Sequence, residues 1–232
     1  MDALILAGGL GKRLRTVVND RPKPMALIGN KPFLAVLLNF LLNSGVKKAI
    51  LSVGYKHEKI LEYFGNNYNG CEIEYSLEDK PLGTGGAIAK SIKHIKSDNF
   101  LICNGDTFFN FNLENYLNFH KEKKSVLSIC GFLNSETDRY DGIDHNKDNK
   151  IISFSSQKSN ICNAGSYLCK LKYFEKLDLP NVFSFERYLK EAQCKKNNFF
   201  VYTDDKEEKF IDIGLPDDYN ISGLFLKQFM EK

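Results

Sequence analysis

The chain has 232 residues, of which 43% are hydrophobic, and its 32 basic and 29 acidic side chains give a formal net charge of +3. This balance lacks the clustered basic face of a nucleic-acid-binding protein, and no apolar run reaches the roughly 20 residues of a membrane span, so we expect neither partner. Residues 1–7 have no basic n-region, so no signal peptide is expected and the predicted location is cytoplasmic.

Cysteine and histidine are scattered along the chain. The six cysteines form no C-x-x-C pair, and several lie in apolar runs, so we expect buried hydrophobic side chains rather than a zinc or disulfide site. His57, His94 and His120 fall on helices predicted to lie at the surface, and no role is assigned to them.

Strand and helix patterns alternate through the first half of the chain. The predicted strands are 3–7, 48–53, 71–76 and 99–103, and the predicted helices are 33–43, 58–64 and 84–95. This alternation is typical of βαβ units, which build a mainly parallel sheet with helices on both faces.

The second half is predicted to be mixed. A helix at 113–122 is followed by strand-like runs and short helical segments, and a closing helix begins near residue 217. We expect one Rossmann-like α/β domain over residues 1–232, in which the half after about residue 110 lies over the carboxyl edge of the first-half sheet. The predicted strands are 125–132, 151–154, 164–169, 199–203 and 210–213, and the remaining helices lie near 173–177 and 185–193.

A glycine-rich loop follows the first strand. Gly8, Gly9 and Gly11 let backbone N–H groups approach an anion, and Lys12 and Arg13 add two positive charges. The loop lacks the Gly-Lys-Ser/Thr of a P-loop and the third glycine of a dinucleotide fingerprint. It is predicted to bind phosphate, and a plain tight turn between strand and helix is the alternative.

Lys23 lies between two prolines. Pro22 and Pro24 bias the local backbone toward extended conformations, which would hold the ammonium in a fixed place. By itself this segment would suit a surface loop.

Together, residues 6–14 and 22–25 resemble the signature of the sugar-phosphate nucleotidyltransferases, also called NDP-sugar pyrophosphorylases. Within that family, residues 51–57 and 210–219 are similar to the short D-glycero-α-D-manno-heptose 1-phosphate guanylyltransferases. The likeness extends through residues 78–87, 104–106, 163–167 and 210–214.

The resemblance implies a fold and a reaction. The fold would be GT-A-like, with a nucleotide-binding half over about 1–110 and a sugar-binding half over about 111–232. The reaction would transfer GMP from GTP to a heptose 1-phosphate and release pyrophosphate, in the synthesis of precursors for a surface glycan such as capsule or lipopolysaccharide. A homo-oligomer is compatible with the sequence.

A sugar 1-phosphate oxygen is already an anionic nucleophile, so this chemistry needs positive charge more than a general base. Arg13 and Lys23 are the predicted catalytic residues: Arg13 and Lys12 would neutralise the triphosphate, and Lys23 would meet the α-phosphate or the incoming phosphate. The other predicted nucleotide-binding residues are Leu6, Ala7, Gly8, Gly9, Gly11, Glu78, Pro81, Gly83 and Thr84.

Asp106 and Asp212 are the predicted metal ligands. Asp106 follows a buried strand and Asp212 ends or interrupts a second one, so two carboxylates would meet phosphate oxygens around Mg²⁺. Capping of a turn or helix is the alternative role for each aspartate.

Glu78 favours guanine. A carboxylate only accepts hydrogen bonds, and guanine offers two adjacent donors, N1–H and the 2-amino group. A glutamate that faces solvent is the alternative. Backbone at Gly83–Gly86 is predicted to approach the base or ribose, with Thr84 opening the following helix.

The sugar-phosphate site implied by the resemblance comprises Asn104, Gly105, Gln157, Lys158 and Asn163. Gln157 stands where the family commonly has Glu, Lys12 where it commonly has Thr, and residues 140–142 depart from its usual Tyr-Gly order. The first departure puts the identity of the sugar in doubt.

Other functions remain open. The acceptor or nucleotide could differ, with mannose, glucose or an amino sugar, with CTP or UTP, or with phosphocholine. Another alternative is a protein without catalytic activity that binds a nucleotide-sugar and regulates a partner. Such a protein would be free to lose charged site residues, whereas this chain has Arg13, Lys23, Asp106 and Asp212. A GT-A glycosyltransferase would show Asp-x-Asp where this chain has Asn104-Gly105-Asp106.

Overall fold

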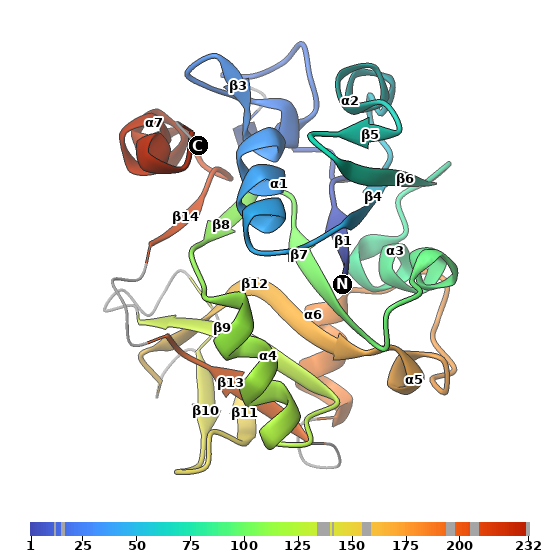
Figure 1. Ribbon diagram of the computed structural model, residues 1–232, viewed down its shortest axis with the longest axis vertical. Coiled ribbons are helices and arrows are strands. Elements are labelled where there is room, and N and C mark those ends of the chain that lie inside the picture. The colour runs from blue at the N-terminus through green and yellow to red at the C-terminus, as the bar shows by residue number, and fades with distance from the viewer. Residues whose placement is uncertain are drawn as a thin grey trace.

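The computed structural model describes residues 1–11, 13–14, 17–133, 140, 142–154, 159–193, 198–204 and 209–230. Within these residues one eight-stranded sheet crosses the molecule in the order β13-β9-β12-β7-β1-β4-β6-β5, from the lower edge to the upper right in Figure 1. Its strands are β1 (Asp2–Leu6), β4 (Lys48–Val53), β5 (Asn67–Tyr68), β6 (Cys71–Leu77), β7 (Asn99–Asn104), β9 (Leu127–Leu133), β12 (Ile161–Lys170) and β13 (Phe199–Tyr202).

The first-half strands form the parallel core of the sheet. β1 pairs in parallel with β4 and β7, and β4 pairs in parallel with β6. The side chains of β1, β4 and β7 are buried on both faces, which explains their nearly continuous apolar runs, whereas β6 alternates between buried and more exposed side chains. The prediction of a mainly parallel α/β sheet is confirmed.

The second half is mixed, but its predicted position over the carboxyl edge was right for only part of it. β12 pairs antiparallel with β7 and with β9, and β13 pairs in parallel with β9. These three strands therefore extend the same sheet sideways, whereas residues 210–214 lie at its carboxyl edge, beside Asp106. The apolar run of β12 agrees with its place inside the sheet, because its side chains are buried on both faces.

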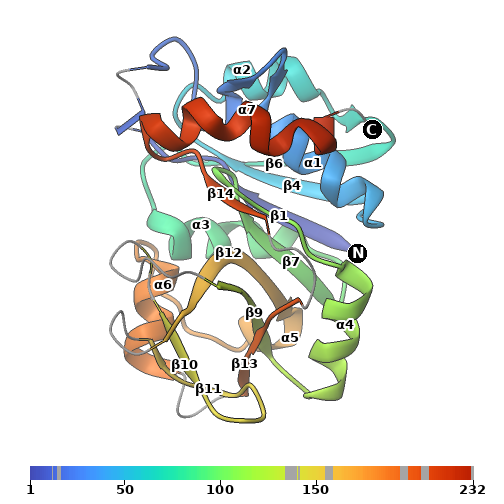
Figure 2. The same cartoon turned by 90° about the vertical axis from the view of Figure 1, so that its left-hand side faces the viewer.

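Helices cover both faces of the sheet, as predicted. Side chains of β1 alternate between two apolar clusters: Ala3 and Ile5 pack with α1, α2, α4 and α7, whereas Leu4 packs with α3, α5 and α6. Figure 2 shows α1, α2 and α7 above β1 and β4. The helices are α1 (Phe33–Asn43), α2 (Glu58–Phe64), α3 (Gly83–Ser91), α4 (Leu113–Glu122), α5 (Leu171–Phe174), α6 (Phe185–Tyr188) and α7 (Pro216–Met230).

Local signals account for several helix ends. The side chain of Asn112 caps α4 by accepting from the N–H of Asn115, and Ser184 caps α6 by accepting from Arg187. The predicted helix 84–95 ends earlier, because Ile92–His94 form a 3₁₀ turn, which satisfies terminal carbonyls. The predicted helix 185–193 is α-helical only to Tyr188 and π-helical over Leu189–Gln193.

The strands that sequence patterns missed are short. The missed strand β8 (Thr107–Phe109) pairs antiparallel with the predicted strand β14 (Phe210–Asp212), and the missed strand β10 (Ile143–His145) pairs with the predicted strand β11 (Ile151–Phe154). The missed strands β2 (Leu27–Ile28) and β3 (Lys31–Pro32) pair with each other. Runs of two or three residues carry no periodicity that could reveal them.

One histidine predicted to lie at the surface is buried. His120 is fully buried on the inner face of α4, where Nδ1 lies 2.8 Å from Ser128 Oγ, so its predicted surface position was wrong.

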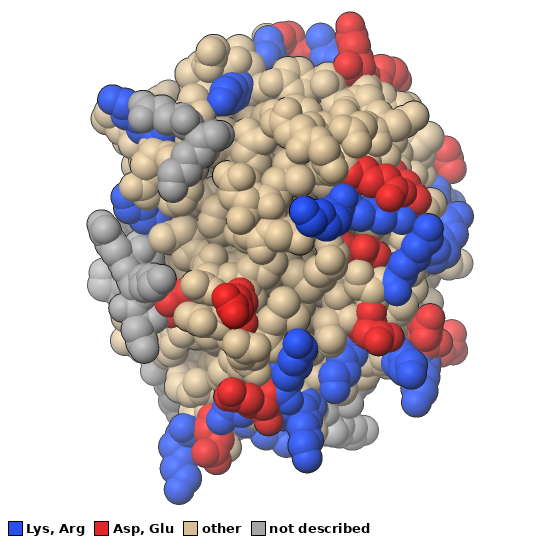
Figure 3. All heavy atoms as spheres, in the orientation of Figure 1, with Lys and Arg blue, Asp and Glu red and all other residues tan. Residues whose placement is uncertain are grey.

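The described cysteines are buried free thiols. Across the face in Figure 3, acidic and basic side chains intermingle. No helix in the described part of the chain is long and apolar enough to cross a membrane.

Candidate active site

The carboxyl ends of four parallel strands meet at one edge of the sheet. β1, β4, β6 and β7 end there at Leu6, Val53, Leu77 and Asn104. The crevice beyond such ends is where open α/β sheets bind ligands. Two adjacent cavities lie at this edge, and both are lined by Leu6, Gly9 and Asp106.

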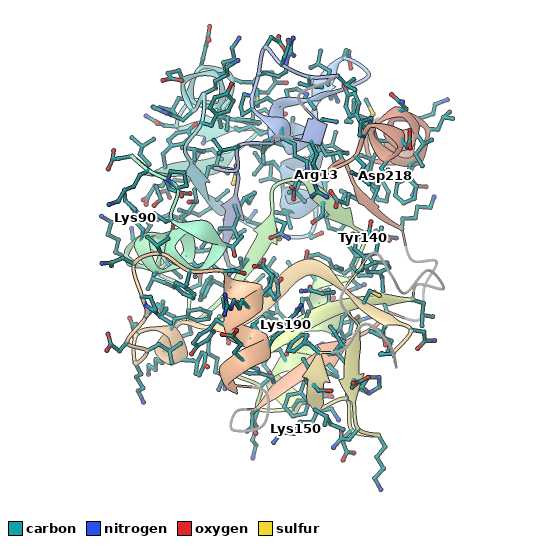
Figure 4. All side chains as sticks on the ribbon, turned by 180° about the vertical axis from the view of Figure 1, so that it is seen from behind. Arg13, Lys90, Tyr140, Lys150, Lys190 and Asp218 are labelled. Atoms are coloured by element: carbon teal, nitrogen blue, oxygen red, sulfur yellow. The ribbon has the colours of Figure 1, made fainter. Side chains whose placement is uncertain are left out.

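The first cavity is cationic and lies under the glycine-rich loop. Arg13, Lys23, Pro24 and Gly214 line it together with Gly11. Gly11 has φ +56° and passes so close to Lys23 that an added Cβ would lie 2.9 Å from the Lys23 Cβ. The loop thus needs glycine here. Figure 4 shows Arg13 in the same upper half of the molecule as Asp218 of α7.

Lys23 joins the two predicted metal ligands. Its Nζ lies 2.5 Å from Asp106 Oδ2 and 3.4 Å from Asp212 Oδ1, and the lysine side chain is only 9% exposed. Lys23–Met25 form a 3₁₀ turn with Pro22 as its N-cap and Pro24 as its second residue, so the extended backbone predicted at Lys23 was wrong. The prolines therefore fix Lys23 inside the site, and the surface-loop alternative is wrong.

The β8–β14 pair brings the two aspartates together. Thr107 is the register partner of Asp212, and the N–H of Ile213 donates to the Asp106 carbonyl at 3.0 Å. The N–H of Gly214 donates to Asp212 Oδ1 at 2.7 Å, which orients that carboxylate. Asp212 thus also caps the turn at residues 213–214, which was the alternative role given for it.

The two carboxylates suit a divalent cation. Oxygens from two separate strand ends converge on one positive charge, the Lys23 ammonium, which stands in for a cation at this point. Mg²⁺ is commonly held by one or two carboxylates, with substrate phosphates and water completing its shell. No group of three or more potential His, Cys, Asp or Glu ligands converges within the described ranges, so such an ion would depend on substrate oxygens.

Glu78 lies in the second cavity. Ser52 Oγ donates to its Oε1 at 3.1 Å, and the N–H of Leu82 donates to its Oε2 at 3.2 Å. The cavity is also lined by Gly8, Pro81, Gly83, Thr84 and Asn104. Glu78 is therefore an anchored, partly buried carboxylate, and the solvent-facing alternative is wrong.

The glycines at 83–86 have a packing role beside the predicted approach to the base or ribose, which stays a prediction. A Cβ at Gly83, Gly85 or Gly86 would lie within 2.4 Å of Phe183 or Asn181 atoms, because the segment 181–185 packs on these residues. The Thr84 hydroxyl donates to Glu186 Oε2 at 2.7 Å. The glycine run thus makes room for another part of the chain, although Gly83 and Thr84 still line the cavity.

Three of the five predicted sugar-phosphate residues lie in the part of the chain that the structure describes, and their role stays a prediction. Asn104 borders the second cavity, and Gly105 makes a turn so tight that a Cβ would lie 2.7 Å from the Leu6 carbonyl oxygen. The Asn163 amide donates to the Tyr167 hydroxyl and accepts from the N–H of Gly165, so both its ends are engaged within β12. Lys12, Asp141, Gln157 and Lys158 lie outside the described residues.

Several residues near the site were missed. Leu10, Pro24, Ala87 and Gly214 line the cavities, and Ser52 binds Glu78 from below. A serine near the carboxyl end of the apolar strand β4 was the available signal for the last of these. Ala7 lies behind the loop, buried, with its N–H bonded to the Ser52 carbonyl.

Relatives share this architecture over nearly their whole length. The chain is 44% identical over 223 residues to the D-glycero-alpha-D-manno-heptose 1-phosphate guanylyltransferase of Aneurinibacillus thermoaerophilus, covering 94% of this chain and 95% of that one. It is 41% identical to the Campylobacter jejuni enzyme of the same name, covering 94% and 97%.

Solved structures have a similar fold. Crystal structures of HddC from Yersinia pseudotuberculosis match with 33% identity, at a TM-score of 0.81 over 98% of this chain and 99% of that one. A second HddC structure, complexed with GMP-PN, matches at 0.80 over 96% and 98%. The model of the nucleotidyl transferase family matches residues 2–228, so the chain belongs to that family.

Proposed function

We propose that this enzyme transfers GMP from GTP to D-glycero-α-D-manno-heptose 1-phosphate and releases pyrophosphate. The observation that carries this proposal is the placement of the anchored Glu78 carboxylate in a cavity that shares walls with the cavity of Arg13 and Lys23. One ligand could span both cavities, with its base at Glu78 and its phosphates at the cations.

Glu78 is the proposed base-selecting residue. Guanine presents N1–H and the 2-amino group side by side, whereas the matching edges of the other common bases place an acceptor beside a donor. Two relatives named as guanylyltransferases and a similar structure complexed with GMP-PN support guanine.

Positive charge and fixed N–H groups are the proposed source of catalysis. A phosphate oxygen of the sugar 1-phosphate would form a bond to the α-phosphorus while the bond to the α–β bridging oxygen breaks, and that oxygen leaves with pyrophosphate. Arg13 and Lys23 would neutralise the charge that moves onto the leaving group, and the loop at Gly8, Gly9 and Gly11 would orient the phosphates. No proton needs to be removed from the nucleophile.

Magnesium is the proposed metal. Members of this family generally use a divalent metal ion, and Asp106 and Asp212 provide hard oxygen ligands of the kind Mg²⁺ prefers. The ion would supply charge neutralisation across the triphosphate and orient its phosphates.

Heptose is the proposed sugar on the strength of the two heptose 1-phosphate guanylyltransferases at 44% and 41% identity. Asn104, Gly105, Gln157, Lys158 and Asn163 remain the candidate sugar-phosphate residues. We further propose that the reaction runs in the cytoplasm, where nucleoside triphosphates are made, and that its product is used for a surface glycan such as capsule or lipopolysaccharide.

Pyrophosphate release tests the proposal. GTP, CTP, UTP, dTTP and ATP are each combined with heptose, mannose, glucose and N-acetylglucosamine 1-phosphates, with Mg²⁺ present. Release restricted to GTP with the manno-configured heptose is expected. A strong signal with another pair would replace the specificity while keeping the mechanism, and silence across the panel would leave the regulatory-binder alternative standing.

A further inference from the structure

We infer that Ser52 is a positioning residue that holds the Glu78 carboxylate in the orientation needed to select guanine. The inference rests on the proposed base-selecting role of Glu78. Ser52 is fully buried at the carboxyl end of β4, and its hydroxyl donates to Glu78 Oε1 at 3.1 Å. A hydrogen bond to an ionised acceptor is stronger than one between neutral groups.

The strand itself gives no structural reason for a hydroxyl at this position. The neighbours Leu51 and Val53 are buried and apolar, and Ser52 faces the side of the sheet that α3 covers. A buried hydroxyl costs stability unless it is hydrogen-bonded, and the bond to Glu78 satisfies this one. Its location is therefore explained by the carboxylate above it.

Ser76 provides a comparison within the same sheet. It is the register partner of Ser52 on β6 and is 3% exposed. No described residue forms a hydrogen bond with the Ser76 hydroxyl. The two serines are both buried on adjacent paired strands, and of the two only Ser52 donates a hydrogen bond to Glu78.

Glu78 is confined on its other sides as well. The N–H of Leu82 donates to its Oε2 at 3.2 Å, and an added Cβ at Gly8 would lie 2.5 Å from its Oε1. A carboxylate offers about four lone-pair positions, of which these donors use two, so acceptor capacity remains for two donors of a base. The terminal torsion of glutamate has broad, weak preferences, so loss of the hydroxyl would release the carboxylate from a single orientation.

Ser52 acts through Glu78 and not on the ligand directly. Among the described residues that line the two cavities, Ser52 does not occur, whereas Glu78 does. A change at Ser52 should therefore alter the choice of base before it alters the transfer chemistry.

The test compares GTP with ITP, which lacks the 2-amino group. For the full chain, kcat/KM with each nucleotide and the equilibrium affinity for each are measured in wild type, Ser52→Ala, Glu78→Gln and the double variant. Ser76→Ala is the matched control, and Ser52→Thr keeps the hydroxyl. Melting temperatures show whether each variant is folded.

Wild type should prefer GTP over ITP by about 10-fold to 100-fold, the range expected for one hydrogen bond to a charged group. Ser52→Ala should reduce that ratio by roughly fivefold or more, Ser52→Thr should restore part of it, and Ser76→Ala should leave it unchanged. In the Glu78→Gln background, Ser52→Ala should cause no further change in the ratio.

Four results would overturn the inference. If wild type selects GTP and Ser52→Ala has the same GTP/ITP preference, Ser52 has no part in base selection, while the proposed role of Glu78 stands. Equal losses for GTP and ITP, or a Ser52→Ala effect that persists beside Glu78→Gln, would show a merely structural role. A wild type that does not prefer GTP over ITP would instead overturn the base assignment at Glu78, and the inference with it.

Discussion

The ammonium of Lys23 lies 2.5 Å from Asp106 Oδ2 and also reaches Asp212 Oδ1 at 3.4 Å. Lysine therefore occupies the point where the two proposed metal ligands converge. A cation at that point offsets the repulsion between the carboxylates, so a divalent ion that binds there must displace the ammonium. The displaced charge would then be free to meet a phosphate.

Replacing Lys23 by methionine tests this competition. Lys23→Met should strengthen Mn²⁺ binding to the nucleotide-free protein by about tenfold or more, because the two carboxylates lose the one ion-pair partner they have among the described residues. Turnover should fall by roughly 100-fold or more. Electron paramagnetic resonance of free Mn²⁺ gives the affinity.

Lys31→Met is the control for this change. The Lys31 ammonium is bound elsewhere: it donates to the main-chain oxygen of Met230 at 2.7 Å. Its Mn²⁺ affinity should equal that of wild type. Unchanged Mn²⁺ affinity in Lys23→Met would refute the competition.

Asp106→Asn should abolish most metal-dependent turnover while the fold is retained. An amide keeps the shape of the side chain but removes the negative charge that a hard divalent ion needs, so a loss of about 100-fold or more is expected. Asp98→Asn, an exposed change beside the opposite end of β7, is the matched control. Near-normal turnover of the Asp106 variant at limiting Mg²⁺ would remove this residue from the metal site.

Gly85→Ala should destabilise the protein and weaken GTP binding. The new methyl group would lie 2.2 Å from the Phe183 ring, and overpacking of this kind costs about 1–3 kcal/mol. Thr84, which lines the nucleotide cavity, would move with it. Urea unfolding and the KM for GTP measure both effects.

Two companion variants sharpen the result for Gly85. Gly223→Ala lies in α7 with no atom within 4 Å of the added Cβ, so it should stabilise the protein by up to about 1 kcal/mol through helix propensity. Phe183→Ala combined with Gly85→Ala should recover part of the lost stability. If the free energy of unfolding lost in the double variant equals the sum of the losses in the two single variants, the steric explanation fails.

His120 should make the protein less stable in mild acid. Burial lowers the pKa of His120 from 6.5 to about 4. Between these values the unfolded chain binds a proton that the folded chain does not, so the free energy of unfolding falls as the pH drops from about 6.5 to about 4. The loss between pH 7 and pH 5 should be about 2 kcal/mol.

His120→Gln should remove that part of the pH dependence, measured as the difference between urea unfolding free energies at pH 7 and pH 5. His145→Gln, on the partly exposed strand β10, is the control and should keep the wild-type difference. Equal pH dependence in the two variants would contradict the assignment to His120.

Local pattern sufficed for much of the fold. The sequence predicted α1, α2, α4, β4 and β11 with the observed bounds, because apolar periodicity and caps act within one segment. It also predicted the parallel core, since βαβ units allow few topologies. The family resemblance pointed to the loop at residues 8–14, Lys23, Glu78, Asp106 and Asp212, and the structure places the described members of this set around two adjacent cavities.

Only the tertiary structure decided which of these groups touch. Lys23 lies 83 and 189 positions from its two aspartate partners. Strand β14 was predicted, but the three-residue strand β8, whose pairing with β14 joins those aspartates, has no periodicity to detect. The glycines at 83–86 accommodate residues 181–185, and Ser52 holds Glu78 from a different strand. A sequence thus reveals the groups available for chemistry and the segments that carry them. Side-chain contacts between distant segments depend on register and packing, which arise only when the whole sheet forms.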